Sequence, residues 1–106
     1  MLTAKEALLK TQNAKKDFKE KSIKFFNSEK KHIEQDIIKA AEEGKTKVNI
    51  HYAPSDFYPY GLKSSESIDV LIECIKQQLI EMGYKCSISY NTFTNAFLVT
   101  CSWEEK

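Results

Sequence analysis

The sequence predicts an α+β fold whose elements follow the order α-β-α-β-β. Helical periodicity dominates residues 3–43, clean alternation of apolar and polar residues marks 46–53 and 85–90, and an amphipathic stripe lies between those two segments. A crossover helix makes its flanking strands parallel, and the last two strands read as a hairpin. We therefore expect a three-stranded split β-α-β sheet with the third strand in the middle and the core helices on one face.

The first helix is expected to begin at Thr3, because Thr3 followed by Glu6 matches a capping box. Apolar and small residues then recur at steps of three and four, which forms the narrow seam that a helix pair or coiled coil uses. The seam residues to which we assign oligomerisation are Ala7, Thr11, Ala14, Phe18 and Phe25.

Asn27 and Ser28 form the natural place for a break, because Ser28 is able to cap a second helical segment. The sequence leaves open whether the helix continues through this pair. From residue 29 the apolar face broadens, and Gly44 supplies a stop. We divide the chain into a helical arm, 1–27, and an α/β core, 28–106.

The helical region is long for a chain of 106 residues. A continuous helix over 3–43 measures ~60 Å, whereas a unit made from the remaining residues is only about 20–30 Å across. The helix must overhang, fold back at a break or pack against another chain. Self-association into a homo-oligomer is the functional expectation that follows.

The rest of the chain reads as strand, helix and hairpin. Residues 46–53 alternate as a half-buried strand, and a second helix begins at Ser64, Ser65 or Ser67 and ends at Gly83. Residues 85–90 and the segment from Phe97 form the last two strands. The open face of this sheet is expected to be polar except for one large apolar side chain, and it shows Asn49, His51, Ser87, Ser89, Leu98, Thr100 and Ser102.

Three aromatic residues lie in a proline-bracketed loop over 54–61, which is the best candidate for a contact surface. The alternative is that Phe57 and Tyr60 fold back as a lid over the core. Aromatic rings could stack on a base while a lysine and a helix N-terminus hold a phosphate. The residues assigned to partner or ligand binding are Phe57, Tyr58, Tyr60, Lys63, Ser64 and Ser65.

Composition and residue spacing argue against several classes of function and identify none. The sixteen basic residues are all lysine, and the net charge is +1; the absence of arginine argues against sequence-specific nucleic-acid recognition. Non-specific binding remains a minority interpretation, because lysines outnumber acids over 10–31. Two histidines and three cysteines show no metal-ligand spacing. We expect no metal, no cofactor and no enzymatic activity, and a reducing, cytoplasmic location without membrane attachment.

Three short segments carry a resemblance: 37–44 (IIKAAEEG), 79–84 (LIEMGY) and 100–103 (TCSW). In these the chain resembles small, largely uncharacterised proteins of tailed bacteriophages that show the pattern A-A-x-x-G, then G-Y, then S-W. The resemblance covers roughly residues 33–103. It implies a phage protein working in the host cytoplasm.

Two kinds of function follow as expectations. The first is a non-enzymatic binding protein that antagonises a host defence system by capturing a host protein or sequestering a nucleotide signal. The alternative is a virion structural or assembly protein that uses its N-terminal helix for oligomerisation. Non-specific nucleic-acid binding through the lysine-rich arm is the second alternative.

Overall fold

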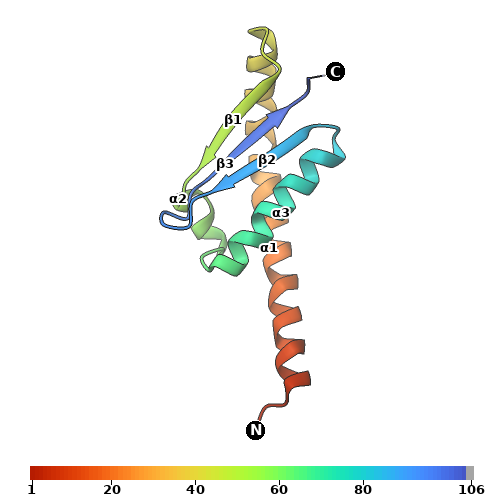
Figure 1. Cartoon of the computed structure of the whole chain (residues 1–106), viewed down its shortest axis with the longest axis vertical. Helices are drawn as coiled ribbons and strands as arrows, with labels where there is room; N and C mark the ends of the chain where they lie inside the picture. The colour runs from red at the N-terminus through yellow and green to blue at the C-terminus, as the bar shows by residue number, and fades with distance from the viewer. Residues whose placement is uncertain (105–106) are drawn as a thin grey trace.

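The computed structural model describes residues 1–104, and it has an α+β fold in the predicted element order (Figure 1). The first half of the chain is taken up largely by one helix. The elements are α1 (Ala4–Glu42), β1 (Lys47–Tyr52), α2 (Pro54–Phe57), the 3-10 turn η1 (Tyr58–Tyr60), α3 (Ser65–Glu81), β2 (Lys85–Tyr90) and β3 (Phe97–Ser102). The segment expected to be a loop over 54–61 is therefore mostly short helix.

α1 is one continuous helix of 39 residues, so of the two alternatives that the sequence leaves open at Asn27 and Ser28 the structure has the unbroken helix. Ser28 begins no new segment, because its Oγ donates to the carbonyl oxygen of Phe25 at 2.7 Å within the same helix. Phe25 and Phe26 before the pair and Ile33 after it are all buried in one core. Tertiary packing on both sides holds the helix through a pair whose own helix propensity is low.

The helix overhangs the rest of the molecule (Figure 1), and the whole chain measures 61 × 27 × 23 Å. Every residue from Met1 to Asp17 is exposed, and Phe18 is the first side chain of α1 that packs against the core. Because Ser22, Phe25 and Phe26 are buried as well, the core does not begin at residue 28. The free arm is shorter than expected and ends near Phe18.

The helix ends agree with their sequence signals. Thr3 caps α1, since its Oγ1 accepts from the Glu6 amide at 3.1 Å, and Ser64 caps α3 by accepting from the Ser67 amide at 3.2 Å. Gly83 follows α3 with a φ of 95°, a left-handed conformation that favours glycine. Among the three serines that could begin the second core helix, the structure selects Ser64.

The sheet has the order β1-β3-β2, and β3 is antiparallel to both neighbours. Val99 in the middle strand lies opposite Ile50 on one side and Ile88 on the other. The first two strands are therefore parallel to each other, which confirms the split β-α-β arrangement. β1 and β2 form the edges.

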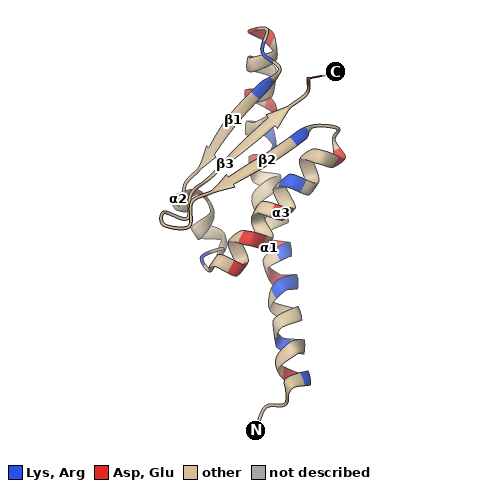
Figure 2. Cartoon of the chain, viewed as in Figure 1, with Lys and Arg blue, Asp and Glu red and all other residues tan. Residues whose placement is uncertain are grey.

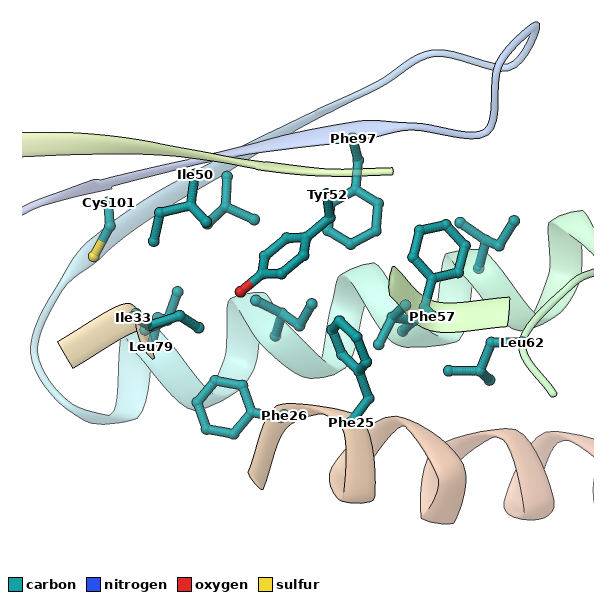
Figure 3. Close-up of a cluster of buried hydrophobic side chains, with 14 residues drawn as sticks. Phe25, Phe26, Ile33, Ile50, Tyr52, Phe57, Leu62, Leu79, Phe97 and Cys101 are labelled. Atoms are coloured by element: carbon teal, nitrogen blue, oxygen red, sulfur yellow. The ribbon is translucent and has the colours of Figure 1, made fainter. Parts of the chain in front are cut away.

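One face of the sheet is covered by α1 and α3, and the core lies between these two layers (Figure 3). Phe25 contributes the central ring on the helix side: its centroid lies 5.4 Å from that of Tyr52 and 5.3 Å from that of Tyr60, both edge-on. The sheet contributes inward side chains from all its buried positions, which are Ile50, Tyr52, Phe97, Val99 and Cys101.

Candidate functional site

The aromatic segment after β1 is organised by its prolines and by Asp56. Pro54 occupies the first turn of α2, and the Asp56 carboxylate accepts from the Ala53 amide at 2.8 Å. Gly61 ends η1 with a φ of 82°. These local contacts turn the segment back over the end of the core, as Figure 1 shows between β1 and α3.

Phe57 is a core residue, so its predicted role in partner binding is wrong. Its side chain is 0% exposed, and its ring centroid lies 5.5 Å from that of Phe97 and 6.4 Å from that of Phe25 (Figure 3). A small domain has few ways to fill its core, and an aromatic ring beside the sheet end is used for burial rather than recognition.

Tyr58 and Tyr60 are half-buried and tied to the rest of the molecule by their hydroxyls. The Tyr58 hydroxyl accepts from Asn95 Nδ2 at 3.0 Å, and the Tyr60 hydroxyl donates to Ser28 Oγ at 2.8 Å. The first contact fixes the segment to the β2–β3 turn, and the second fixes it to α1. The lid interpretation of this segment fits the structure better than that of an exposed contact surface.

Lys63, Ser64 and Ser65 are exposed at the start of α3. The Ser64 side chain already accepts from the first turn of the helix, and Ser65 Oγ donates to Glu66 Oε2 at 3.2 Å. Phe57 is therefore buried away from any base, and the Ser64 hydroxyl already caps the helix start, so two of the six residues assigned to ligand binding are occupied within the chain.

The predicted oligomerisation seam divides in two at the edge of the core. Ala7, Thr11 and Ala14 are exposed on the arm, whereas Phe18 is half-buried against the core. Phe25 is only 1% exposed, so its assignment to an intermolecular seam is wrong. The helical spacing was read correctly, but its C-terminal part serves the fold of one chain.

Leu8 and Leu9 are functional candidates that the residues assigned to oligomerisation do not include. Their side chains are 57% and 58% exposed on a stretch of α1 in which every residue is exposed. Two adjacent leucines in a helix otherwise rich in lysine were the available signal. Exposed large apolar side chains that cluster in this way mark interaction surfaces.

The lysines of α1 do not gather on one side. They alternate with acids along the helix (Figure 2), and Lys21 pairs with Asp17 at 2.8 Å. At 100° per residue the members of the predicted basic stretch point all around the axis: Lys10, Lys15, Lys16, Lys19, Lys21, Lys24, Lys30 and Lys31. This distribution gives little support to a phosphate-binding face.

The uncovered face of the sheet is polar in the way the alternation predicts. Thr100 Oγ1 donates to Asn49 Oδ1 at 2.9 Å across the β1–β3 pair, and charged residues stand only at strand starts, at Lys47 and Lys85 (Figure 2). A shallow hollow of about 530 Å³ lies at the β2–β3 turn between His51 and Phe93. Phe93 is 98% exposed, and it is another apolar side chain that the predicted sites did not include.

The three cysteines are free thiols, and their surroundings lower their nucleophilic reactivity. Burial raises the pKa of Cys101 to about 11, with Cys86 nearby adding to the effect, and burial also raises the pKa of Cys74 and that of Cys86. A thiol with a raised pKa is protonated near neutrality and is a poor nucleophile. Burial likewise raises the pKa of the Tyr52 phenol, with the Glu29 carboxylate as the next contribution.

Within residues 1–104, no three His, Cys, Asp or Glu side chains lie close enough together to hold a metal ion. No helix in that part of the chain combines the length and apolar character needed to cross a membrane. No protein-family model, curated protein or solved structure matches this chain significantly, so its resemblance to small phage proteins stays a prediction.

Proposed function

We propose that this protein acts by binding and assembly, without a catalytic step, and that the N-terminal part of α1 is its docking element. The exposed arm over residues 1–17 is the observation that carries the proposal. Leu8 and Leu9 are the exposed large apolar side chains in its helical part, which begins at Ala4.

The arm extends a helix whose nucleation the packed residues of the core already provide, so each arm residue adds only the small free energy of helix propagation. Residues 4–17 gain little stability from packing against the rest of the molecule, since every one of them is exposed. A partner that covers Leu8 and Leu9 would supply the missing stabilisation. At about 25 cal/mol per Å² of apolar area, burial of the two leucines alone contributes about 3 kcal/mol.

Assembly fits the geometry better than capture of a nucleotide signal. The aromatic rings required for base stacking are directed to the core or held by hydrogen bonds to Asn95 and Ser28. Of the two settings that the phage resemblance implies, virion assembly and antagonism of a host system, the docking helix favours assembly. A captured host protein is the competing occupant of the same arm.

Light scattering on the full chain tests this proposal. We expect an oligomer for the wild type and a monomer for Leu8→Glu combined with Leu9→Glu, because two buried carboxylates oppose association. The matched control combines Lys10→Gln with Asn13→Glu, which changes the charge by the same amount at exposed polar positions of the arm. If the leucine variant keeps the wild-type mass, the arm is not the docking element.

A further inference from the structure

The exposed apolar residues of α1 are arranged symmetrically about its midpoint. Ile23 is the central residue of a helix that runs from Ala4 to Glu42, and it is 38% exposed. Leu8 lies fifteen positions before it and Ile38 fifteen positions after it, and both are about half exposed. At ~1.5 Å per residue each lies ~22 Å from Ile23 along the axis.

These residues also share one side of the helix. At about 100° per residue, Leu8 lies ~60° to one side of the Ile23 direction and Leu9 lies ~40° to the other side. Ile37 lies ~40° to the side of Leu8, and Ile38 lies ~60° to the side of Leu9. One face of α1 therefore carries apolar groups at both ends and at the centre.

An apolar groove lies on that face beside the C-terminal half of α1. It has a volume of about 330 Å³ and is formed between α1 and the end of α3, with Lys30 and Glu34 as polar members of its lining. Its apolar lining comes from Phe26, Ile33, Ile37, Ile38, Leu79, Met82 and Tyr84. The arm carries the protruding leucines and the core carries the groove, and both are on one straight helix.

We propose that the occupant of this groove is the arm of a second copy of the chain, in an antiparallel α1–α1 pair whose two-fold axis passes at Ile23. This inference rests on the proposed function, whose docking element it assigns to a particular partner and orientation. A two-fold interface uses the same patch on both copies, and a helix with its apolar groups placed symmetrically about the midpoint meets that requirement.

In this pair each arm lies along the groove of the other copy. The mirrored angles bring Leu8 of one copy against Ile37 of the other, at the mouth of the groove, and Leu9 against Ile38. Ile23 meets its own counterpart at the axis. The two helices overlap over their full length, so both arms are covered at once.

Charge favours the antiparallel orientation over the parallel one. Residues 3–22 carry six lysines and three acids, whereas residues 24–43 carry four lysines and five acids. The antiparallel pair places the basic half of each helix beside the slightly acidic half of the other, and it also opposes the two helix dipoles. A parallel pair would place the two basic halves together.

The expected contact is modest in size. About a third of a helix faces a single partner, so the 39 residues of α1 supply about thirteen contacts per copy, with the end of α3 adding a few. A standard interface uses about 20–30 residues a side. We therefore expect a dimer that dissociates on dilution.

Disulfide trapping of the full chain tests the orientation. Ile23→Cys is expected to form a covalent dimer on mild oxidation, because the two new thiols meet at the axis. Leu9→Cys alone is expected not to, since its two copies lie ~42 Å apart in an antiparallel pair. Leu9→Cys mixed with Ile38→Cys should form a heterodimer, and the wild type controls for the native thiols.

A matched pair of groove variants gives a second readout. Met82 and Ile80 are each 47% exposed at the end of α3, but only Met82 lines the groove. Met82→Glu should weaken dimerisation by at least about tenfold, and Ile80→Glu should leave the dissociation constant nearly unchanged. Sedimentation equilibrium measures both.

The outcomes separate this inference from the proposed function. Covalent dimers from Leu9→Cys alone, or none from Ile23→Cys, would overturn the antiparallel pair. If this happens while the Leu8→Glu, Leu9→Glu variant still loses assembly, the arm remains the docking element with another partner surface. A dimer whose dissociation constant depends neither on the arm leucines nor on Met82 would have its interface elsewhere on the molecule, and both proposals would fail.

Discussion

Phe25 connects the long helix to the rest of the fold. Its ring meets three aromatic rings, from β1, α2 and η1, all edge-on and within 6.4 Å between centroids. This one residue therefore joins α1, the sheet and the folded-back aromatic segment. This arrangement explains why Phe25, which the sequence pattern places in an intermolecular seam, is buried in the core of its own chain.

Replacing this residue tests its place in the core. Phe25→Ala should lower the free energy of unfolding by about 3–5 kcal/mol, because it removes buried surface and leaves a cavity. Phe93→Ala is the matched control and should change it by less than about 0.5 kcal/mol, since that ring is 98% exposed. Urea unfolding at low protein concentration measures both, and similar losses would contradict the assignment.

The raised pKa of the Cys101 thiol makes the free energy of unfolding depend on pH. Its thiol pKa is raised from 9.0 to about 11 by burial and by nearby Cys86, so between these values the folded chain keeps a proton that the unfolded chain releases. The contribution is complete below pH 9 and is lost as pH rises toward 11, at up to about 1.4 kcal/mol per pH unit. The stability gap between the wild type and Cys101→Ala should narrow over this window. A constant gap in urea unfolding at pH 8, 9.5 and 11 would contradict the prediction.

At the scale of elements, the continuity of α1 determines what the molecule presents to others. A helix that ended at Asn27 could fold its arm back, whereas an unbroken one carries Leu8 and Leu9 away from the core. Burial of Phe25, Phe26 and Ile33 on the two sides of Asn27 fixes the direction of the arm.

Replacing Asn27 by proline tests whether α1 must be continuous at this position or can break there. Asn27→Pro should lower the free energy of unfolding by about 3 kcal/mol, because it removes a hydrogen bond inside the helix and clashes with the preceding turn. Asn27→Ala should raise it slightly, since the position is exposed and alanine is the better helix former. Tolerance of the proline, measured by thermal unfolding, would show that the helix can break there.

Alternation and caps made most elements predictable. The three strands, their order and the starts at Thr3 and Ser64 depend on local patterns that survive in the structure. The aromatic segment was not predictable in the same way, because the direction of Phe57 depends on space left by Phe25 and Phe97, which lie far away in sequence. For the same reason, periodicity alone placed Phe25 in a seam without showing which chain it faces.

The whole molecule is an elongated body that carries its exposed arm leucines and its apolar groove on opposite parts of one helix. The arm and the groove cannot meet within a chain, because a straight α1 holds Leu8 and Ile38 about 45 Å apart. They can meet between two chains. In the proposed dimer this self-complementarity pairs α1 with its counterpart along its full length, which accounts for a helix that is long for so small a domain.

Small-angle X-ray scattering tests this at the scale of the assembly. In the antiparallel pair the two helices overlap fully, so the longest dimension of the dimer should stay close to the 61 Å extent of one chain, while the scattering mass doubles. Pairing of the arms end to end would nearly double that dimension instead. The Leu8→Glu, Leu9→Glu variant supplies the monomer, whose radius of gyration should lie near the backbone value of 15.9 Å with a hydration layer added. A dimer much longer than its monomer would exclude the full overlap of α1.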